Sequence, residues 1–532
     1  MAHDILLRGG TLIDGTGAPG RTADVLVADG RVVDVSAVGA GGLDVNASEV
    51  VDIPGAVVCP GFIDLHSHAD FTVFGAPEAV TQVTQGVTTL VTGNCGFSPF
   101  PVVPHHADEL RAHGRFIDDG LTWEWSSAGE YADAVGRLPL GVNLALQVGH
   151  GALRIAAMGG ADRAPTPAEL ERMRALVARS ANAVVGFSTG LIYAPGTYAE
   201  ADELVAIATQ TAAEGLLYST HMRDEGGGLL DAVNEALTIS RRSGVRLEIS
   251  HLKASGPAFW GSVAEALDLI EAARAEGVDV GADQYPYTAS STTLTSWLPG
   301  WALDGGPAAM LKRLDDPDQA ERIARDLGGD VGGSFDPERI VVADTPDGPY
   351  QRFVGRTIEA AAVELGLDTA HAAVELLRGQ RGLLGVVNHS MSEDDVRRIL
   401  RDPAVAVASD GHVLGCPGRG RPHPRGLGTF TRVLGHYVRD ERVLDLPLAV
   451  RTMTELPASR LGWSDRGVVR PGAVADLAVF DSGTVTDRAS FEDPWQLSTG
   501  VLHTLVGGTM VLRDGVPTST PAGQVIHRRP RP

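Results

Sequence analysis

The sequence predicts an α/β protein built around a (β/α)8 TIM-like barrel, with a small β-sandwich domain assembled from both termini and an inserted lid subdomain. Three observations predict this architecture. Apolar strands alternate with helical stretches through the middle of the 532-residue chain, and both of its ends consist of short alternating strands. One connection between two barrel strands is far too long for a single helix. A chain of this length exceeds one ordinary core, so two or three domains are expected.

The two ends of the chain share one pattern. Residues 4–58 contain the turn-bounded runs ILLRGG, TLIDGTG and DVLVADGRVVDVS, and residues 465–532 contain ADLAVFD and HTLVGGTMVLRDGVP. Alternation with period two between such turn signals is typical of short strands with one buried face. We therefore expect residues 1–58 and 465–532 to form one composite β domain, which the chain leaves to build a large insert.

Residues 59–464 are expected to form the barrel. Helical stretches such as PAELERMRALVARSA and VAEALDLIEAARAEG separate apolar strands, and roughly eight strand–helix units are the signature of this fold. An insertion is expected at about 290–380, where WLPGWALDGG and DPDQAERIARDL occur. The expected strands end near Asp64, Gly93, Gly149, Ser188, His221, His251, Asp283 and Asp410.

Composition narrows the class of protein. The formal net charge is −23 and the sequence has no basic run, which argues against a nucleic-acid partner. No segment approaches the roughly 20 apolar residues of a membrane span, and the start, MAHDILLRGGTLIDG, lacks the apolar run of a signal peptide. Three cysteines argue against a disulfide framework. We expect a cytoplasmic protein without a membrane partner; its oligomeric state is not predicted.

The stretch PGFIDLHSHAD, residues 60–70, carries the first chemical signal. His66 and His68 follow an apolar run and are two residues apart, so in an extended chain they point to the same side. A lone histidine at a strand end is by default a hydrogen-bonded core residue. Burying two imidazoles without partners is costly, however, and binding one metal ion removes that cost. The pair therefore favours a metal site.

Further ligand-type residues stand at the ends of other expected strands. Catalytic groups of such barrels collect at the C-terminal ends of the strands, and imidazole, thiolate and carboxylate are the ligands that zinc prefers. The ordinary alternatives are a small core cysteine in GNCG and a turn carboxylate in SDG. The whole constellation favours a metal site over both. Its members are His66, His68, Cys95 in GNCG, His221 in STHMRDE, His251 in EISHLKASG and Asp410 in SDG.

The other two cysteines carry less information. Cys59 precedes Pro60 at the start of the first barrel strand, the wrong end for chemistry, so we interpret it as structural. Cys416 lies in a loop rich in glycine and proline and gives no clear signal.

These motifs together resemble the metal-dependent amidohydrolase superfamily. GNCGFSP and the later HPRGLGTFTRVLGHYVR narrow the resemblance to the D-aminoacylase group, the N-acyl-D-amino-acid deacylases, over nearly the whole chain. The resemblance implies zinc-dependent hydrolysis of an N-acyl-D-amino acid to a carboxylate and a free D-amino acid. It also implies that Cys95, His221 and His251 hold a firmly bound zinc. By the same resemblance, His66 and His68, with Cys95, would form a second position that is weaker or empty.

The remaining site residues follow from chemistry and from the resemblance. Zinc makes a water molecule acidic, and Asp410 is the candidate general base that accepts its proton and delivers it to the leaving nitrogen. Lys253, one of only two lysines in the chain, stands two residues after His251; a compact ammonium can donate to a substrate oxygen, and the alternative is a surface lysine. Arginine's planar fork suits the substrate carboxylate, and Arg425 in HPRG is our choice for that role.

Several alternatives remain open at this point. Arg419 and Arg421 precede Arg425 in GCPGRGRPHPRG and compete with it for the carboxylate. By similarity, Tyr285 and Ser291 in QYPYTASS face the pocket, although Tyr287 could replace Tyr285. Tyr193 in STGLIYAPG is another candidate for the pocket lining, with ordinary packing as its alternative. His150 in VGHGALR ends an expected strand and receives no role.

Two other functions compete with this prediction. A cyclic-amide hydrolase of the hydantoinase or dihydroorotase type shares the barrel and the HxH pair, but is expected to carry a lysine where VVGFSTGLIYAPG has none. A non-catalytic paralogue would be marked by loss of the strand-end ligands, which are all present. The preferred D-amino acid, apolar or acidic, and the acyl group are not predicted.

Overall fold

The computed structural model of the protein describes residues 5–37, 47–330 and 334–528. The parts of the expected terminal β domain at residues 1–4, 38–46 and 529–532, and of the expected insertion at residues 331–333, lie outside the described residues.

The centre of the molecule is an eight-stranded parallel sheet whose strands follow one another in chain order. The first and last strands approach each other through a parallel bridge between Ser67 and Gly411, and the Asp410 amide donates to the His66 carbonyl at 2.8 Å. The sheet is therefore a nearly closed barrel, and the predicted fold class is confirmed. Its strands are β6 (Phe62–Asp64), β7 (Val87–Thr92), β8 (Asn143–Gly149), β9 (Val184–Gly190), β10 (Leu217–His221), β11 (Arg246–Ile249), β12 (Val280–Gln284) and β16 (Val405–Val407).

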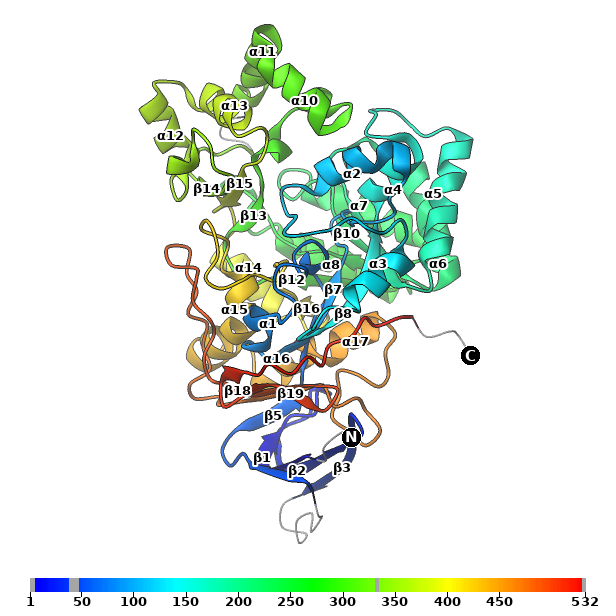
Figure 1. Ribbon diagram of the computed structural model, residues 1–532, viewed down its shortest axis with the longest axis vertical. Coiled ribbons are helices and arrows are strands. Elements are labelled where there is room, and N and C mark those ends of the chain that lie inside the picture. The colour runs from blue at the N-terminus through cyan, green and yellow to red at the C-terminus, as the bar shows by residue number, and fades with distance from the viewer. Residues whose placement is uncertain (1–4, 38–46, 331–333, 529–532) are drawn as a thin grey trace.

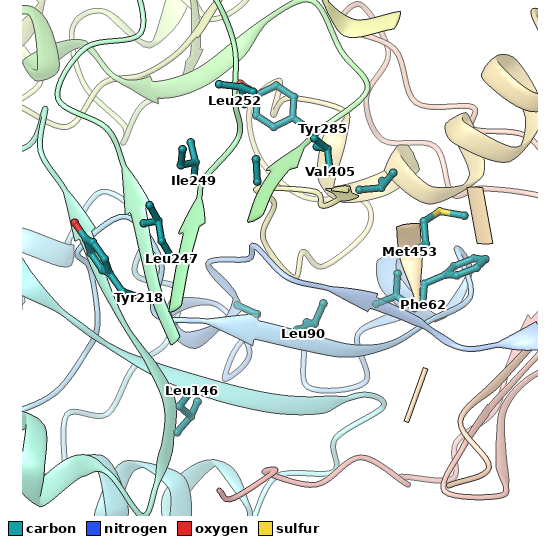
Figure 2. Close-up of a cluster of buried hydrophobic side chains, with 14 of the residues drawn as sticks. Phe62, Leu90, Leu146, Tyr218, Leu247, Ile249, Leu252, Tyr285, Val405 and Met453 are labelled. Atoms are coloured by element: carbon teal, nitrogen blue, oxygen red, sulfur yellow. The ribbon is translucent and has the colours of Figure 1, made fainter. Parts of the chain in front are cut away.

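The barrel strands are buried on both faces, which explains their nearly continuous apolar sequences. Leu90 and Leu146 pack in a large cluster between the strands and the outer helices, whereas their neighbours Val91 and Ala145 pack in a second, smaller cluster. This division follows from the period of two along a strand. Figure 2 shows part of the larger cluster, in which Phe62 and Met453 lie near each other.

Helices surround the barrel strands, and helices of adjacent units pack against one another. The helix α5 begins at a capping box in which Thr166 and Glu169 bond reciprocally with each other's backbone amides. The helices are α1 (Val80–Val83), α2 (Ala107–Gly114), α3 (Ala128–Val135), α4 (His150–Met158), α5 (Pro167–Ser180), α6 (Ala201–Glu214), α7 (Leu229–Ser243), α8 (Val263–Ala275), α14 (Glu393–Leu400), α15 (Arg425–Arg432), α16 (Leu446–Met453) and α17 (Glu455–Arg460), with a π-helical turn, η7 (Val433–Asp440), after α15.

A separate nine-stranded sheet combines strands from both ends of the chain. The strand β5 joins the two halves, since it pairs in parallel with β1 and antiparallel with β17. This sheet has its own apolar core and lies below the barrel in Figure 1. The strands are β1 (Ile5–Leu12), β2 (Arg21–Ala28), β3 (Arg31–Ala37), β4 (Glu49–Asp52), β5 (Val57–Pro60), β17 (Leu477–Phe480), β18 (Val501–Val506), β19 (Thr509–Arg513) and β20 (Val516–Pro517).

The long connection between β12 and β16 forms a third unit with its own core. A three-stranded antiparallel sheet carries helices at the end of the molecule opposite the nine-stranded sheet (Figure 1). We call this unit the inserted segment. Its elements are β13 (Ser290–Thr293), β14 (Ile340–Asp344), β15 (Gly385–Asn388), α9 (Gly300–Leu303), α10 (Gly306–Asp315), α11 (Pro317–Gly328), α12 (Ile358–Leu365) and α13 (Thr369–Gly379), with a 3-10 turn, η5 (Leu294–Trp297), after β13.

Among the described residues, no helix is both long and apolar enough to cross a membrane.

Candidate metal centre and active site

The paired histidines leave β6 at the C-terminal mouth of the barrel. His66 is fully buried and His68 nearly so. Their rings lie 5.7 Å apart between centroids. The His68 amide donates to the Gly411 carbonyl at 2.8 Å, which ties this turn to the segment after β16. The two imidazoles therefore face a point shared by the first and last strands.

Cys95 follows β7 in a tight turn that only particular residues permit. The backbone of Cys95 has φ of 53°, between Gly93 and Gly96, which also have positive φ. A Cβ on Gly93 would lie 2.1 Å from the Gln147 carbonyl oxygen, so this position requires glycine. The Ser188 hydroxyl from β9 accepts from the Gly96 amide at 3.0 Å and donates to the Gly93 carbonyl. The GNCG sequence thus fixes the thiol at the mouth of the barrel.

His221 and His251 come from the ends of adjacent strands. His221 is the last residue of β10, and His251 follows β11 by two residues. Their ring centroids lie 4.4 Å apart, nearly perpendicular to each other. His251 has φ of 36°, and Asp410, after β16, has φ of 50°. Positive φ is unfavourable in non-glycine residues and recurs at functional sites.

The six side chains form two overlapping groups in which every ligand atom lies within 4.8 Å of the others. His66 Nε2 lies 3.2 Å from Cys95 Sγ, which in turn lies 3.6 Å from His251 Nε2. Cys95 belongs to both groups, which therefore share its Sγ atom. One group is Cys95, His221 and His251, and the other is His66, His68, Cys95 and Asp410.

The electrostatics of the cluster favour ionised ligands. Burial disfavours the thiolate of Cys95, but the charge of His66 and the adjacent imidazoles of His221 and His251 outweigh burial, so the pKa of this thiol lies well below its usual value. Burial likewise opposes ionisation of Asp410, yet Arg425 and His66 hold the pKa of that carboxyl well below its usual range. A thiolate and a carboxylate among imidazoles are ligand types that suit a divalent cation.

Several buried nitrogens at this point lack partners, which tests whether the residues fit a metal. Neither ring nitrogen of the buried His221 has a hydrogen-bond partner among the described residues. Leaving such groups unsatisfied in the interior is costly. Because the orphaned nitrogens stand beside a thiol that favours its ionised form, this donor set fits a zinc ion.

A second layer of contacts orients the ligands. Glu225 Oε1 lies 3.0 Å from His251 Nδ1 and 2.5 Å from Lys253 Nζ. Burial opposes the charge of Glu225, but Lys253 and His221 lower the pKa of its carboxyl. Asp283, from β12, accepts from the His251 amide at 2.7 Å and lies 3.5 Å from His66 Nδ1. A carboxylate on the far nitrogen of a ligating histidine fixes its tautomer and ring orientation.

A cleft of about 950 Å³ opens in front of the cluster, between the barrel mouth and the inserted segment. Tyr285 lies beneath two cations, with Lys253 Nζ 5.6 Å and the Arg425 guanidinium 5.0 Å from its ring centroid. The Tyr193 hydroxyl lies 3.0 Å from the Thr292 hydroxyl. All five of the expected substrate residues line this cleft: Lys253, Tyr285, Ser291, Arg425 and Tyr193.

The competing assignments differ in position. Arg425 is buried with Nη1 2.6 Å from Asp410 Oδ2, whereas Arg419 lies at the exposed rim, 3.5 Å from Asp344. Arg421 and Tyr287 are not among the residues that line the cleft. Geometry therefore favours Arg425 and Tyr285 over their alternatives.

Some residues near the site were not predicted from the sequence, and others were predicted to have no catalytic role. Glu225 stands four residues after His221 in STHMRDE, and its charge beside a buried histidine is the signal that could have identified it. His150 bonds Glu203 Oε1 at 2.9 Å, and Glu203 also binds the buried Arg154, so this trio braces the barrel wall. Cys59 and Cys416 are free thiols away from the cluster, and burial raises the pKa of Cys59.

The fold and the cluster together define a class: a parallel α/β barrel with a built metal centre at its C-terminal mouth. The chain matches the amidohydrolase family Amidohydro_3 over residues 49–512. It belongs to this family.

Individual relatives are similar to this chain over nearly its full length. D-aminoacylase of Alcaligenes xylosoxydans xylosoxydans is 37% identical, over 99% of this chain and 98% of the relative. N-acyl-D-glutamate deacylase of the same organism is also 37% identical, over 99% and 96%. The crystal structure of N-acyl-D-glutamate deacylase from Bordetella bronchiseptica, complexed with zinc and a phosphonate mimic of the tetrahedral intermediate, is similar with a TM-score of 0.83, 36% identity, and coverage of 99% of this chain and 100% of that one. The predicted resemblance is confirmed.

Proposed function

We propose that the protein is a zinc-dependent hydrolase that splits the amide bond of N-acyl-D-amino acids into a carboxylate and a free D-amino acid. The observation that carries this proposal is the position of Cys95 Sγ, which belongs to both candidate ligand groups. In many amidohydrolases a lysine at the end of the fourth strand has this bridging place, but β9, VVGFSTG, has none. The relatives with full-length similarity are deacylases of N-acyl-D-amino acids by name.

Cys95, His221 and His251 would hold the firmly bound zinc, and His66 and His68 would complete a second, weaker position with Cys95. A bound zinc ion supplies Lewis acidity, which polarises an amide carbonyl and makes a water molecule acidic enough to attack near neutral pH. Glu225 supports the firm position, because it fixes the ring of His251 from its other nitrogen.

Asp410 is the residue that we assign to proton transfer. Its Oδ1 lies 3.1 Å from His68 Nε2, and its Oδ2 faces Arg425. Because this environment keeps the carboxylate ionised, it can accept a proton from the attacking water. The same proton is then delivered to the leaving nitrogen as the carbon–nitrogen bond breaks, so that the amine departs neutral.

The wall of the cleft beside Asp410 suits the α-carboxylate of the substrate. Arg425 Nη2 donates to the Ser291 carbonyl oxygen at 3.4 Å. This hydrogen bond is long and therefore weak, so a substrate carboxylate can replace it. Lys253 supplies a compact second cation, and the hydroxyl of Tyr285, which donates to the sulfur of Met391 at 3.7 Å, can exchange this weak contact for a substrate oxygen. This wall would anchor the amino-acid half of the substrate and leave the amide at the metal cluster.

The inserted segment would act as the lid predicted from the sequence, since it supplies the far side of the cleft. All three cysteines are free thiols, which suits a reducing compartment, and we propose a cytoplasmic location on this ground.

The test is a substrate panel. The zinc-loaded protein is incubated with N-acetyl-D- and N-acetyl-L-amino acids, covering apolar and acidic side chains, and the free amine is quantified. We expect release from D-substrates and at least a hundredfold less from their L-enantiomers. Absence of release from every D-substrate, together with ring opening of hydantoins, would replace this proposal with a cyclic-amide hydrolase.

A further inference from the structure

A second, smaller cavity of about 120 Å³ adjoins the cleft. We call it the side cavity. Five residues line both spaces, so the side cavity lies directly beside the cleft: Phe97, Phe116, Ile192, Tyr193 and Ser296. Its remaining wall comes from the helices α2 and α4, the loop after β9 and the inserted segment.

The lining of the side cavity is mostly apolar, and its charged side chains are paired with other residues. Its apolar side chains include Ile155, Leu303, Met310 and Leu383. The two charged residues of the lining have partners: Glu109 accepts from the Gly160 amide at 2.6 Å, and Arg381 pairs with Asp315 at 3.0 Å. Burial lowers the pKa of His113 to about 4, so this imidazole is neutral at physiological pH. Such a lining favours an uncharged hydrocarbon group over a carboxylate.

Only two aromatic rings separate the side cavity from the metal cluster. Phe97 lies 6.5 Å from His68 between ring centroids and 4.6 Å from His113, against which it stacks. Tyr193 lies 5.1 Å from both Phe97 and His221. Because Phe97 and Tyr193 line both spaces, a group attached to a carbonyl at the cluster can extend past these rings toward the side cavity.

The strand order decides which half of the substrate points there. The proposed carboxylate wall follows β12 and β16, through Tyr285 and Arg425. At the barrel mouth, the side cavity uses the segments after β7, β8 and β9, through Phe97, Ile155 and Ile192, while the inserted segment, which follows β12, covers it from outside. In the barrel order, β8 and β9 lie diametrically opposite β12 and β16. The two substituents of an extended amide point in opposite directions. When the amino-acid half faces Arg425, the acyl half faces the side cavity.

We propose that the side cavity is the binding site for the acyl group, and that the protein prefers apolar acyl groups longer than acetyl. This inference rests on the proposed deacylase function and adds its substrate class. An apolar cavity of roughly 150 Å³ holds a benzene ring in another protein. The side cavity is smaller, about 120 Å³, so it accommodates a short alkyl chain such as butanoyl or hexanoyl, and a single ring tests its upper limit.

The first experiment measures kcat/KM for a series of acyl chains on one D-amino acid. The amino acid is the best one from the N-acetyl panel, and the acyl groups are acetyl, butanoyl, hexanoyl and phenylacetyl. Each methylene group buried in an apolar site contributes roughly a threefold gain. We therefore expect N-butanoyl to exceed N-acetyl by roughly tenfold, mostly through a lower KM.

The second experiment fills the cavity. Ala112, on α2, lines the side cavity but not the cleft, so Ala112→Trp narrows the cavity without touching the metal cluster. The ratio of kcat/KM between N-hexanoyl and N-acetyl substrates should fall to near one in this variant. The matched control is Arg111→Trp, which places the same side chain on the exposed face of α2 and should keep the wild-type ratio. Ala112→Leu serves if the tryptophan variant does not fold.

The possible outcomes distinguish a failure of this inference from a failure of the proposed function on which it rests. If N-acetyl-D-amino acids are hydrolysed but the acyl series is flat in the wild-type protein, this inference is wrong and the proposed function stands. If Ala112→Trp changes the order of preference among N-acetyl-D-alanine, -valine, -leucine and -phenylalanine while the acyl series stays unchanged, the cavity holds the amino-acid side chain instead. If no N-acyl-D-amino acid is hydrolysed, the proposed function itself fails, and this inference falls with it.

Discussion

Both ends of the barrel bury charged side chains, but the groups that these side chains face differ between the two ends. At the N-terminal end, Arg460 from α17 reaches Glu248 at 2.7 Å and Asp279 at 2.5 Å, and it donates to the Leu247 carbonyl at 2.6 Å. At the C-terminal mouth, His221 has no hydrogen-bond partner among the described residues, and Cys95 favours the thiolate. At the N-terminal end the arginine and the two acids pair with each other, although Oε1 of Glu248 has no hydrogen-bond partner among the described residues, whereas the C-terminal mouth presents a set of donor atoms that suits a cation.

This contrast separates stability from function within one fold. Conservative replacement of a buried ionic group is expected to lower stability wherever the group is internally paired. Replacement of a group that binds a metal ion or a substrate is expected to remove metal binding or turnover, with less effect on folding. The two ends of this barrel offer a direct comparison of these expectations.

The largest effect is expected at Cys95. Cys95→Ala removes the atom shared by both ligand groups, so we expect loss of the firmly bound zinc and a fall in kcat/KM to below roughly a thousandth of the wild-type value. Metal analysis of the purified variant and assay on the best N-acyl-D-amino acid measure both. The control is Cys59→Ala, in a buried thiol of β5, which should keep the zinc. Wild-type zinc content in Cys95→Ala would contradict the assignment of the centre.

The next effect is expected at Asp410. Asp410→Asn preserves the shape of the side chain but removes the proton acceptor, and we expect kcat to fall about a thousandfold. The zinc content should remain close to that of the wild type, because the other group of ligands is untouched. Asp476→Asn is the control: Asp476 pairs with Arg466 beside Asn143, at the start of β8. That variant should lose stability and keep kcat. An unchanged kcat in Asp410→Asn would remove Asp410 as the base.

A third prediction concerns the N-terminal end. Arg460→Met leaves the buried Glu248 without its arginine partner and removes one of the two arginines that pair with the half-exposed Asp279, and the free energy of unfolding should fall by about 3 kcal/mol. Kinetic constants and zinc content should stay within about twofold of the wild type. The control is Arg241→Met, in an exposed pair with Glu276, which should change stability by less than about 1 kcal/mol. Urea unfolding measures both variants; an equal loss in both would mean that burial of the pair is unimportant.

The sequence could predict the barrel and name candidates at its mouth because both depend on local patterns. The apolar period of the strands shows where each one ends, and the ligand-type residues stand at those ends, as Cys95 does in GNCG. Contacts between distant loops have no such local signal. The approach of Glu225 to Lys253, and of Arg425 to Asp410, depends on the path of each loop and on side-chain rotamers. The side cavity was likewise not predictable, because it combines α2, α4 and the inserted segment.

The smallest effect is expected where charge is exposed, at the capping box of α5. Hydrogen bonds from Arg163 and from the Thr166 amide lower the pKa of Glu169 to about 2. Since the folded pKa lies below the unfolded value, the stabilisation is present above about pH 4.5 and is lost as the pH falls through about 2. Thr166→Ala should lower the free energy of unfolding by about 1 kcal/mol. Glu169→Gln should lower Tm at pH 7, with a difference from the wild type that shrinks toward pH 3. Glu171→Gln, on the same helix and paired only at the surface with Arg174, should leave Tm unchanged. A difference for Glu169→Gln that grows as the pH falls would contradict the ionised cap.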